Sequence, residues 1–303
     1  MALNILMQLA PLYLLIMLGF LGKHWFQLDE KSIARLAIYV VAPFVFMGLA
    51  AQTNFTLDSL LLPFISFALS SAITLCAWRL HQWFGFKDAR ANLSALGIGG
   101  GNTGYFGLPL FAALFGPEHL GIYILLVMGF GFSEVTIGYY VISRGAFSIA
   151  DSLKRMLRPP TFYAGIAGIL WSFLHLPMPP AGAAMFEWLR GTYIVLGMMI
   201  IGCTLGGMKK LEFDFSYLAA TILGRHLIWP LCAALMILGV RNFSPPVEQS
   251  LWVMSLVPLA ANQVAYASET NIHPEKAATA VIFSTLLAAA VVAFAAPLLT
   301  ALR

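Results

Sequence analysis

Charged side chains are scarce in this sequence. They make up 10% of its 303 residues, whereas 60% of the residues are hydrophobic, and the mean hydropathy is +0.85. A soluble domain carries about a quarter charged residues, and so few charges cannot form a water-facing surface around this much apolar chain. The composition therefore excludes a soluble globular protein and predicts an all-α protein that crosses the lipid bilayer many times.

Motifs for enzyme chemistry, metal binding and nucleotide binding are also missing. The six histidines are scattered, there is no H-E-x-x-H or Walker A sequence, and no two carboxylates share a span at helical spacing. Cys76, Cys203 and Cys232 form no C-x-x-C and lie in apolar segments, where free thiols are expected. The net charge of +4 comes with no basic run for nucleic acid. We expect neither an enzyme nor a cofactor, a metal site or a nucleic-acid partner.

Ten apolar segments have the length of a membrane-spanning helix, about 17–25 residues. The first lacks the basic start and small-residue cleavage site of a signal peptide, so we expect it to be retained as a span. The ten predicted spans are 3–22, 33–52, 59–80, 91–115, 119–143, 161–176, 188–208, 216–239, 248–270 and 275–301.

Basic residues favour one side of this predicted topology. Thirteen of the 17 Lys and Arg residues, Lys209 and Lys210 among them, follow odd-numbered spans, whereas Arg190, Arg241 and Arg303 fall on the opposite side. The positive-inside rule predicts that the thirteen face the cytoplasm and that both termini face outward. We therefore expect a multi-pass protein of the cell (inner or plasma) membrane.

A polar linker separates the spans into two sets of five. We predict a first five-helix repeat at 1–145, a cytoplasmic linker at 146–160 and a second repeat at 161–303. Because five is odd, the second set enters the membrane upside down relative to the first, which defines an inverted repeat. A shift of 160 residues aligns Asn102 in the fourth span with Asn262 in the ninth.

Helix breakers interrupt these two matching spans. The fourth contains "GGGNTGYFGLP" and the ninth contains "VPLAANQ", so we predict breaks near 100–107 and 258–262. Irregular backbone at membrane depth is tolerated only where protein or a water-filled cavity satisfies it, and paired interruptions in two halves indicate a transporter's binding site. The predicted substrate-binding residues are Gly101, Asn102, Thr103, Gly104, Pro258, Asn262 and Gln263.

An anion suits this predicted site. Each broken span supplies a half-helix whose N-terminus carries about half a positive charge, and the two spans run in opposite directions, so the two N-termini can meet. The glycines have a simpler explanation in close helix packing, which we favour for Gly97 and Gly107 taken alone. Pro109 is expected in the first turn of the second half-helix, where its missing N–H costs nothing.

Three ionisable residues lie well inside predicted spans, away from the span ends. Glu134 in the fifth span is a candidate proton carrier or partner of a cation, and a structural role in a wet crevice is an equal alternative. Arg225 in the eighth span either extends to the cytoplasmic surface, which we slightly favour, or joins the anion path or pairs with Glu134. His226 beside it could act with it, although a lone histidine is more often simply hydrogen-bonded.

The segment "GNTGYFGLPL" resembles the auxin efflux carrier family of permeases. The likeness extends to "LAIYVVAPFVF", "VPLAANQVAYASE" and the C-terminal "ATAVIFSTLLAAAVVAFAAPLL", and so covers essentially the whole chain. It implies ten spans in two inverted repeats, a scaffold and a mobile transport domain, and broken helices four and nine crossing at the substrate. Family members carry organic anions, including auxin and dicarboxylates such as malate or malonate. The short linker favours a bacterial-type carboxylate permease over an auxin exporter.

The function expected is secondary-active transport of a small organic anion, a mono- or dicarboxylate or an auxin-like acid, by alternating access. The alternatives are a sodium-coupled organic anion symporter of the bile-acid-symporter type, and an anion channel or sensor on the same fold. The coupling ion, H⁺, Na⁺ or none, is left open, as is import versus export. A homodimer through the scaffold is a further expectation.

Overall fold

The computed structural model describes residues 2–53, 61–208, 212–240 and 243–300, and this part of the chain contains helices and no strands. Lys209, Lys210, Arg241 and Arg303 lie outside the described residues. The helices are α1 (Ala2–Phe26), α2 (Glu30–Arg35), η1 (Leu36–Val41), α3 (Ala42–Ala51), α4 (Leu61–Phe84), α5 (Arg90–Gly99), η2 (Thr103–Gly107), α6 (Leu108–Phe115), η3 (Pro117–His119), α7 (Leu120–Ser133), η4 (Glu134–Gly138), α8 (Tyr139–Ser143), α9 (Ile149–Met156), α10 (Pro160–Phe173), α11 (Pro180–Gly207), α12 (Phe215–Leu223), η5 (Gly224–Ile228), α13 (Trp229–Val240), α14 (Pro245–Leu256), α15 (Asn262–Thr270) and α16 (Pro274–Thr300).

Six continuous helical stretches in the described chain are long and apolar enough to cross a membrane. They are Glu30–Ala51, Leu61–Trp83, Leu120–Ser143, Pro180–Gly207, Phe215–Val240 and Pro274–Ala295. The first predicted span contributes a shorter apolar stretch, Ala10–Phe26. The sixth is the 14-residue helix α10, and the fourth and ninth are each divided in two. The predicted linker at 146–160 contains the helix α9.

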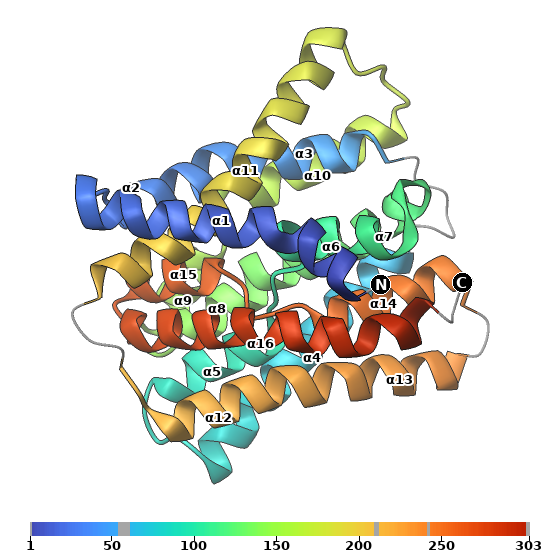
Figure 1. Ribbon diagram of the computed structural model, residues 1–303. Helices are drawn as coiled ribbons and strands as arrows, with labels where there is room; N and C mark the ends of the chain where they lie inside the picture. The colour runs from blue at the N-terminus through green and yellow to red at the C-terminus, as the bar shows by residue number, and fades with distance from the viewer. Residues whose placement is uncertain (1, 54–60, 209–211, 241–242, 301–303) are drawn as a thin grey trace.

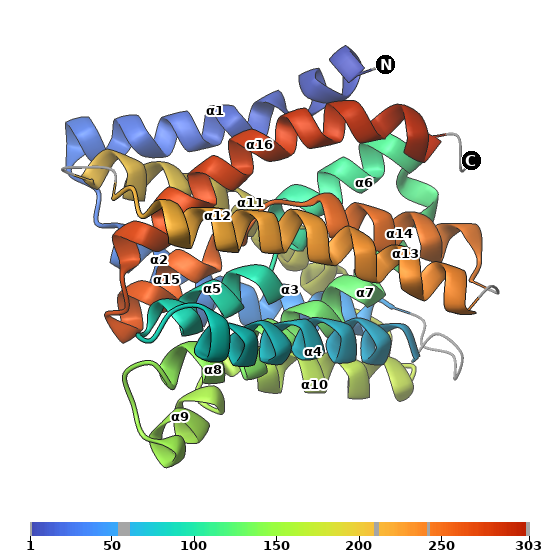
Figure 2. The same cartoon turned by 90° about the horizontal axis from the view of Figure 1, so that it is seen from below.

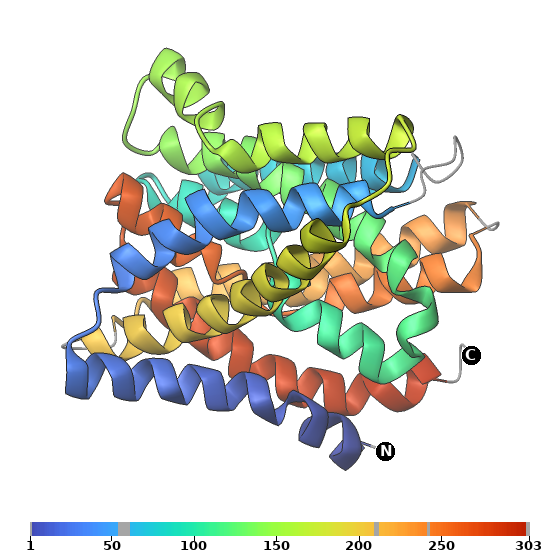
Figure 3. The same cartoon turned by 90° about the horizontal axis from the view of Figure 1, so that it is seen from above.

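Most of the helices run roughly parallel or antiparallel to one another in two groups, and α11 crosses its neighbours obliquely (Figure 1). One group, here called the peripheral group, consists of α1, the α2–η1–α3 stretch, α10 and α11, and it faces the viewer in Figure 3. Within it α1 packs along α11, and α10 packs along α3. The remaining helices form the crossing group, which contains both interrupted helices and in which α4 packs on α5 and α7.

Small residues let the helices of the peripheral group approach closely. The space where a Cβ of Gly202 would stand is taken by the backbone of Ile16 and Phe20, and the same space at Gly19 is taken by the backbone of Met199. Glycines at such helix crossings remove the side chains that would hold two backbones apart. The α1–α11 contact is therefore set by glycine on both helices.

The first helix begins and the last helix ends at the same end of the molecule (Figure 2). At the other end, here called the basic end, Asp214 binds Arg90 and Lys276 through contacts of 2.8 Å each. Its carboxylate also accepts a hydrogen bond from Tyr217 N–H at 3.1 Å and caps α12. These contacts join the starts of α5, α12 and α16.

Four wide, π-helical turns lie within or at the start of otherwise regular helices. They are η1, η2, η4 and η5. Pro43, Pro109 and Pro230 each stand two residues after one of these turns. Proline lacks an N–H and its ring collides with the carbonyl one turn earlier, so a locally widened turn accommodates it. Turns of this kind concentrate at functional positions, and here they contain Thr103, Glu134 and Arg225.

Candidate functional site

The two interrupted helices touch each other at their breaks. Helix α5 ends at Gly99, Gly100 is extended with φ −86° and ψ 168°, and the helix resumes at Thr103. Helix α14 ends at Leu256, and α15 begins at Asn262. The N–H of Asn102 donates to the carbonyl oxygen of Pro258 at 2.8 Å, which joins one break directly to the other. The second half-helix of the fourth span begins with the wide turn η2 at Thr103, and Pro109 lies in the first turn of the regular helix α6 that follows it.

Asn102 caps the half-helix that follows it. Its side-chain oxygen accepts a hydrogen bond from Phe106 N–H at 3.1 Å, and its side-chain nitrogen is buried without a partner. Asparagine at this position satisfies one of the free N–H groups of a helix start. The neighbouring carbonyl of Thr103 accepts a hydrogen bond from the Tyr123 hydroxyl at 3.0 Å.

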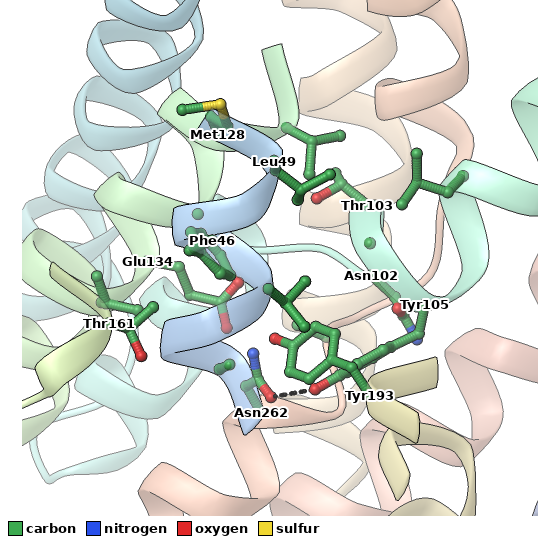
Figure 4. A pocket seen from close by; sticks show the side chains of 18 of the residues that line it. Phe46, Leu49, Asn102, Thr103, Tyr105, Met128, Glu134, Thr161, Tyr193 and Asn262 are labelled. Atoms are coloured by element: carbon green, nitrogen blue, oxygen red, sulfur yellow. Dashed lines mark hydrogen bonds between the residues drawn. The ribbon is translucent and has the colours of Figure 1, made fainter. Parts of the chain in front are cut away.

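A pocket lies between the crossing and the peripheral group (Figure 4). The crossing group contributes Asn102, Thr103, Glu134 and Asn262, and Tyr105 donates from its hydroxyl to the Asn262 side-chain oxygen at 3.3 Å. The peripheral wall is largely apolar. It consists of Ile38, Ala42, Val45, Phe46, Leu49, Thr161, Arg190, Tyr193 and Ile194.

Glu134 is the carboxylate of this pocket. Its side chain is 6% exposed, one of its oxygens has no hydrogen-bond partner, and it points toward Asn262 (Figure 4). Glu134 and Arg225 both lie in the described chain and form no ion pair with each other. A buried carboxylate without a cationic partner is costly and marks a functional candidate.

Two further hollows continue the pocket along the boundary between the groups. One, toward the basic end, shares Ile38 with the pocket and is lined by Lys31, Arg35 and Glu269. The other, toward the end where the chain begins, shares Leu49 and Arg190 with the pocket. The boundary thus holds a row of three hollows with the helix breaks at its middle.

Arg225 does not extend to a surface, which corrects the favoured prediction. It is completely buried, and its guanidinium donates to the carbonyl of Met254 at 2.6 Å and to that of Val257 at 3.2 Å. These carbonyls belong to the end of α14, where a helix carries about half a negative charge. A side chain at Gly101 would come within 2.7 Å of the Arg225 guanidinium carbon, so Arg225 lies behind the break rather than in the pocket.

The remaining predicted residues lie around the crossing in different ways. Gly101 and Gly104 line the pocket, whereas Pro258 contributes its carbonyl to the junction. Gln263 is buried behind the break of the fourth span, next to Gly97 and Gly100, and its amide has no hydrogen-bond partner. His226 pairs with Ser284, whose hydroxyl also accepts from Leu259 N–H at 3.0 Å.

Sequence reasoning missed the aromatic residues of the site. Tyr105 packs against Tyr193 with ring centres 4.4 Å apart, although the two belong to different helix groups. Trp229 donates to the carbonyl of Ile98 at 2.7 Å and so supports the end of α5. The proximity of Tyr105 to the predicted break was the one available signal, and nothing local in the sequence indicates Tyr193.

The chain's apolar helices, its paired helix breaks and its relatives define a multi-pass membrane transport protein rather than an enzyme. The family model described as "Membrane transport protein" matches residues 4–150 and 146–296. The chain belongs to this family, the auxin efflux carrier family. An uncharacterized transporter of Methanocaldococcus jannaschii is 24% identical over 92% of this chain and 94% of its own length. An uncharacterized transporter of Methanothermobacter thermautotrophicus is 25% identical over 94% of this chain and 93% of its own length.

Proposed function

We propose that this protein is a secondary transporter of a small organic anion, which it binds in the pocket at the crossing of the two broken helices. The observation that carries the proposal is that both breaks adjoin one pocket, with Asn102 and Asn262 at the starts of the two half-helices. Helix starts present free N–H groups and a partial positive charge, and they bind carboxylates in many proteins.

A single carboxylate attached to an apolar body fits the pocket better than a dicarboxylate. The electropositive helix starts are on one wall, and the opposite wall carries Val45, Phe46 and Leu49. A second carboxylate would need a second cationic partner. Among the described residues that line the pocket, Arg190 is the one with a cationic side chain, and it already pairs with Glu187 at 2.6 Å.

Alternating access would occur by movement of the two helix groups along the boundary between them. In this proposal the ten spans form two inverted repeats, the peripheral group is the scaffold, and the crossing group moves with the bound anion. The hollows on either side of the pocket would then open in turn to the two faces of the membrane. The basic end would face the cytoplasm, because basic residues concentrate there.

Ligand-induced stabilisation tests the proposal. Purified protein is heated with acetate, benzoate, indole-3-acetate, malonate or malate. A ligand at 100 times its Kd stabilises the folded state by about 2.7 kcal/mol. We expect benzoate or indole-3-acetate to raise the melting temperature more than malonate or malate. The absence of stabilisation by every carboxylate would overturn the proposal.

Variants locate the binding site. Asn102→Ala and Asn262→Ala each remove one hydrogen bond to a charged ligand, so we expect affinity to fall by about tenfold to a hundredfold. Gln82→Ala, which removes an exposed amide that does not line the pocket, should bind as the wild type does. Equal loss of affinity in all three variants would place the binding site elsewhere.

Flux distinguishes a carrier from a channel. In proteoliposomes, a carrier shows uptake that saturates with anion concentration at low turnover, because each cycle requires the conformational change. Flux that rises without saturation would indicate a channel on the same fold. Uptake that requires a sodium gradient would indicate the sodium-coupled alternative.

A further inference from the structure

We propose that one proton enters the site with each anion and that Glu134 carries it. This inference rests on the proposed function, because it concerns the protonation of the same pocket. The step is an acid–base equilibrium: the Glu134 carboxylate takes a proton from water in whichever hollow is open, and it returns the proton to water after the anion leaves on the other side.

Glu134 lies where its carboxyl group can interact directly with the bound anion and with water in the hollows. It stands at the first residue of the wide turn η4 and lines the pocket, with an unpartnered oxygen. The amide of Asn262, which begins the second half-helix, lies beside its carboxyl group (Figure 4). An anion bound at the helix starts would therefore share this amide with Glu134.

Groups that could stabilise a negative charge on Glu134 are few on the elements packed around it. In the described chain, α4 presents Ser71 to the adjacent Ser133, α5 presents Leu96 to Gly138, and α10 presents Thr161 to the pocket. Besides Glu134, the titratable residues that line the pocket in the described chain are three tyrosines and Arg190. On α9, which packs near the end of η4, the charged residues are Asp151, Lys154 and Arg155.

A count of charges at the crossing shows why anion and proton go together. Two helix starts and two helix ends meet there, and their partial charges cancel. Arg225 contributes one positive charge and an ionised Glu134 one negative charge, so the empty site is neutral. A bound anion would leave one uncompensated negative charge in a water-poor interior, which is strongly unfavourable. Protonation of Glu134 restores neutrality.

Proton uptake during binding tests the inference on the wild-type protein. A carboxylate from the panel, benzoate first, is mixed with protein in weakly buffered solution containing a pH indicator. We expect about one proton taken up per anion bound, and a Kd that weakens about tenfold per pH unit where Glu134 is ionised before binding. Binding without proton uptake would overturn the inference and leave the proposed function intact.

Glu134→Gln mimics the protonated side chain. We expect this variant to bind the same carboxylate with a Kd independent of pH and with no proton uptake. Glu275→Gln, which neutralises an exposed carboxylate outside the pocket, should retain the proton uptake of the wild type. Proton uptake that persists in Glu134→Gln would show that another group carries the proton and would overturn the assignment.

Infrared difference spectroscopy tests the charge count without any ligand. The spectrum of ligand-free wild type minus that of Glu134→Gln at neutral pH should show an ionised carboxylate. A protonated Glu134 in the empty site would overturn the inference even if no carboxylate in the panel binds. Stabilisation by an organic cation such as choline, lost in Glu134→Gln, would overturn the anion proposal together with the inference.

Discussion

Replacing Arg225 with methionine tests whether this arginine holds the end of α14. The substitution keeps much of the side-chain volume and removes two charge-assisted hydrogen bonds, to Met254 and Val257. Such bonds contribute about 1.5–3 kcal/mol each, which gives a gross loss of roughly 3–6 kcal/mol. Removing a buried charge returns part of its desolvation penalty, so we expect a net loss of about 2–4 kcal/mol.

The melting temperature of the purified protein in detergent measures this loss. With about 2 °C or slightly more for each kcal/mol in a large domain, Arg225→Met should melt roughly 4–10 °C lower than the wild type. Arg225→Lys should fall between the two, because a single ammonium cannot reproduce the planar fork of a guanidinium. Arg158→Met, at an exposed position of the linker, is the matched control. If Arg225→Met and Arg158→Met melted at the same temperature, Arg225 would not be a cap of α14.

The other predictions concern the basic end. Lys276 and then Arg90 hold the pKa of Asp214 well below its usual range. A carboxyl whose pKa is lowered in the folded state stabilises the fold at pH values above its unfolded pKa, about 3.9, and this stabilisation fades as the pH falls below 3.9. The melting-temperature difference between wild type and Asp214→Asn should therefore be largest near neutral pH and shrink in acid. A difference that stays constant with pH would contradict this prediction. The Tyr39 hydroxyl donates to the Glu269 carboxylate at 2.9 Å and so joins the two helix groups. Removing this hydroxyl with Tyr39→Phe should raise the rate at which a thiol reagent labels a cysteine placed in the adjoining hollow by Ser268→Cys. Unchanged labelling would show that this contact does not hold the hollow closed.

Composition and proline positions account for much of what could be predicted about the fold. The apolar segments predicted where helices lie, because lipid leaves few alternatives to helix for a chain this poor in charge. The wide turns were not predicted, although Pro43, Pro109 and Pro230 mark three of them. Proline shows that regular hydrogen bonding must change, but the sequence does not say whether the helix kinks, breaks or widens.

Only those residues of the candidate site that have a local signal in the sequence could be predicted. Asn102 and Asn262 could be found because the helix breaker beside each is local in sequence and recurs at matching positions. The burial of Arg225 could not be found this way, because its helix is apolar on every side and periodicity cannot separate a lipid-facing from a protein-facing surface. Tyr193 reaches the site from another helix group, and that contact exists only after the groups pack.

The hydrogen bonds of the two asparagines support the proposal that the site binds an anion. The atom of Asn102 that accepts from Phe106 N–H must be its oxygen, because a backbone N–H only donates. The oxygen of Asn262 accepts from Tyr105, so the oxygens of both amides are occupied. The nitrogen of Asn102 has no partner, and the Asn262 amide lies beside Glu134. A cation would need free oxygens, and among the fully buried side-chain oxygens of the described pocket residues only one, on Glu134, has no partner. Once Glu134 binds a proton, its carboxyl can also donate, and the whole polar wall of the pocket then suits a carboxylate.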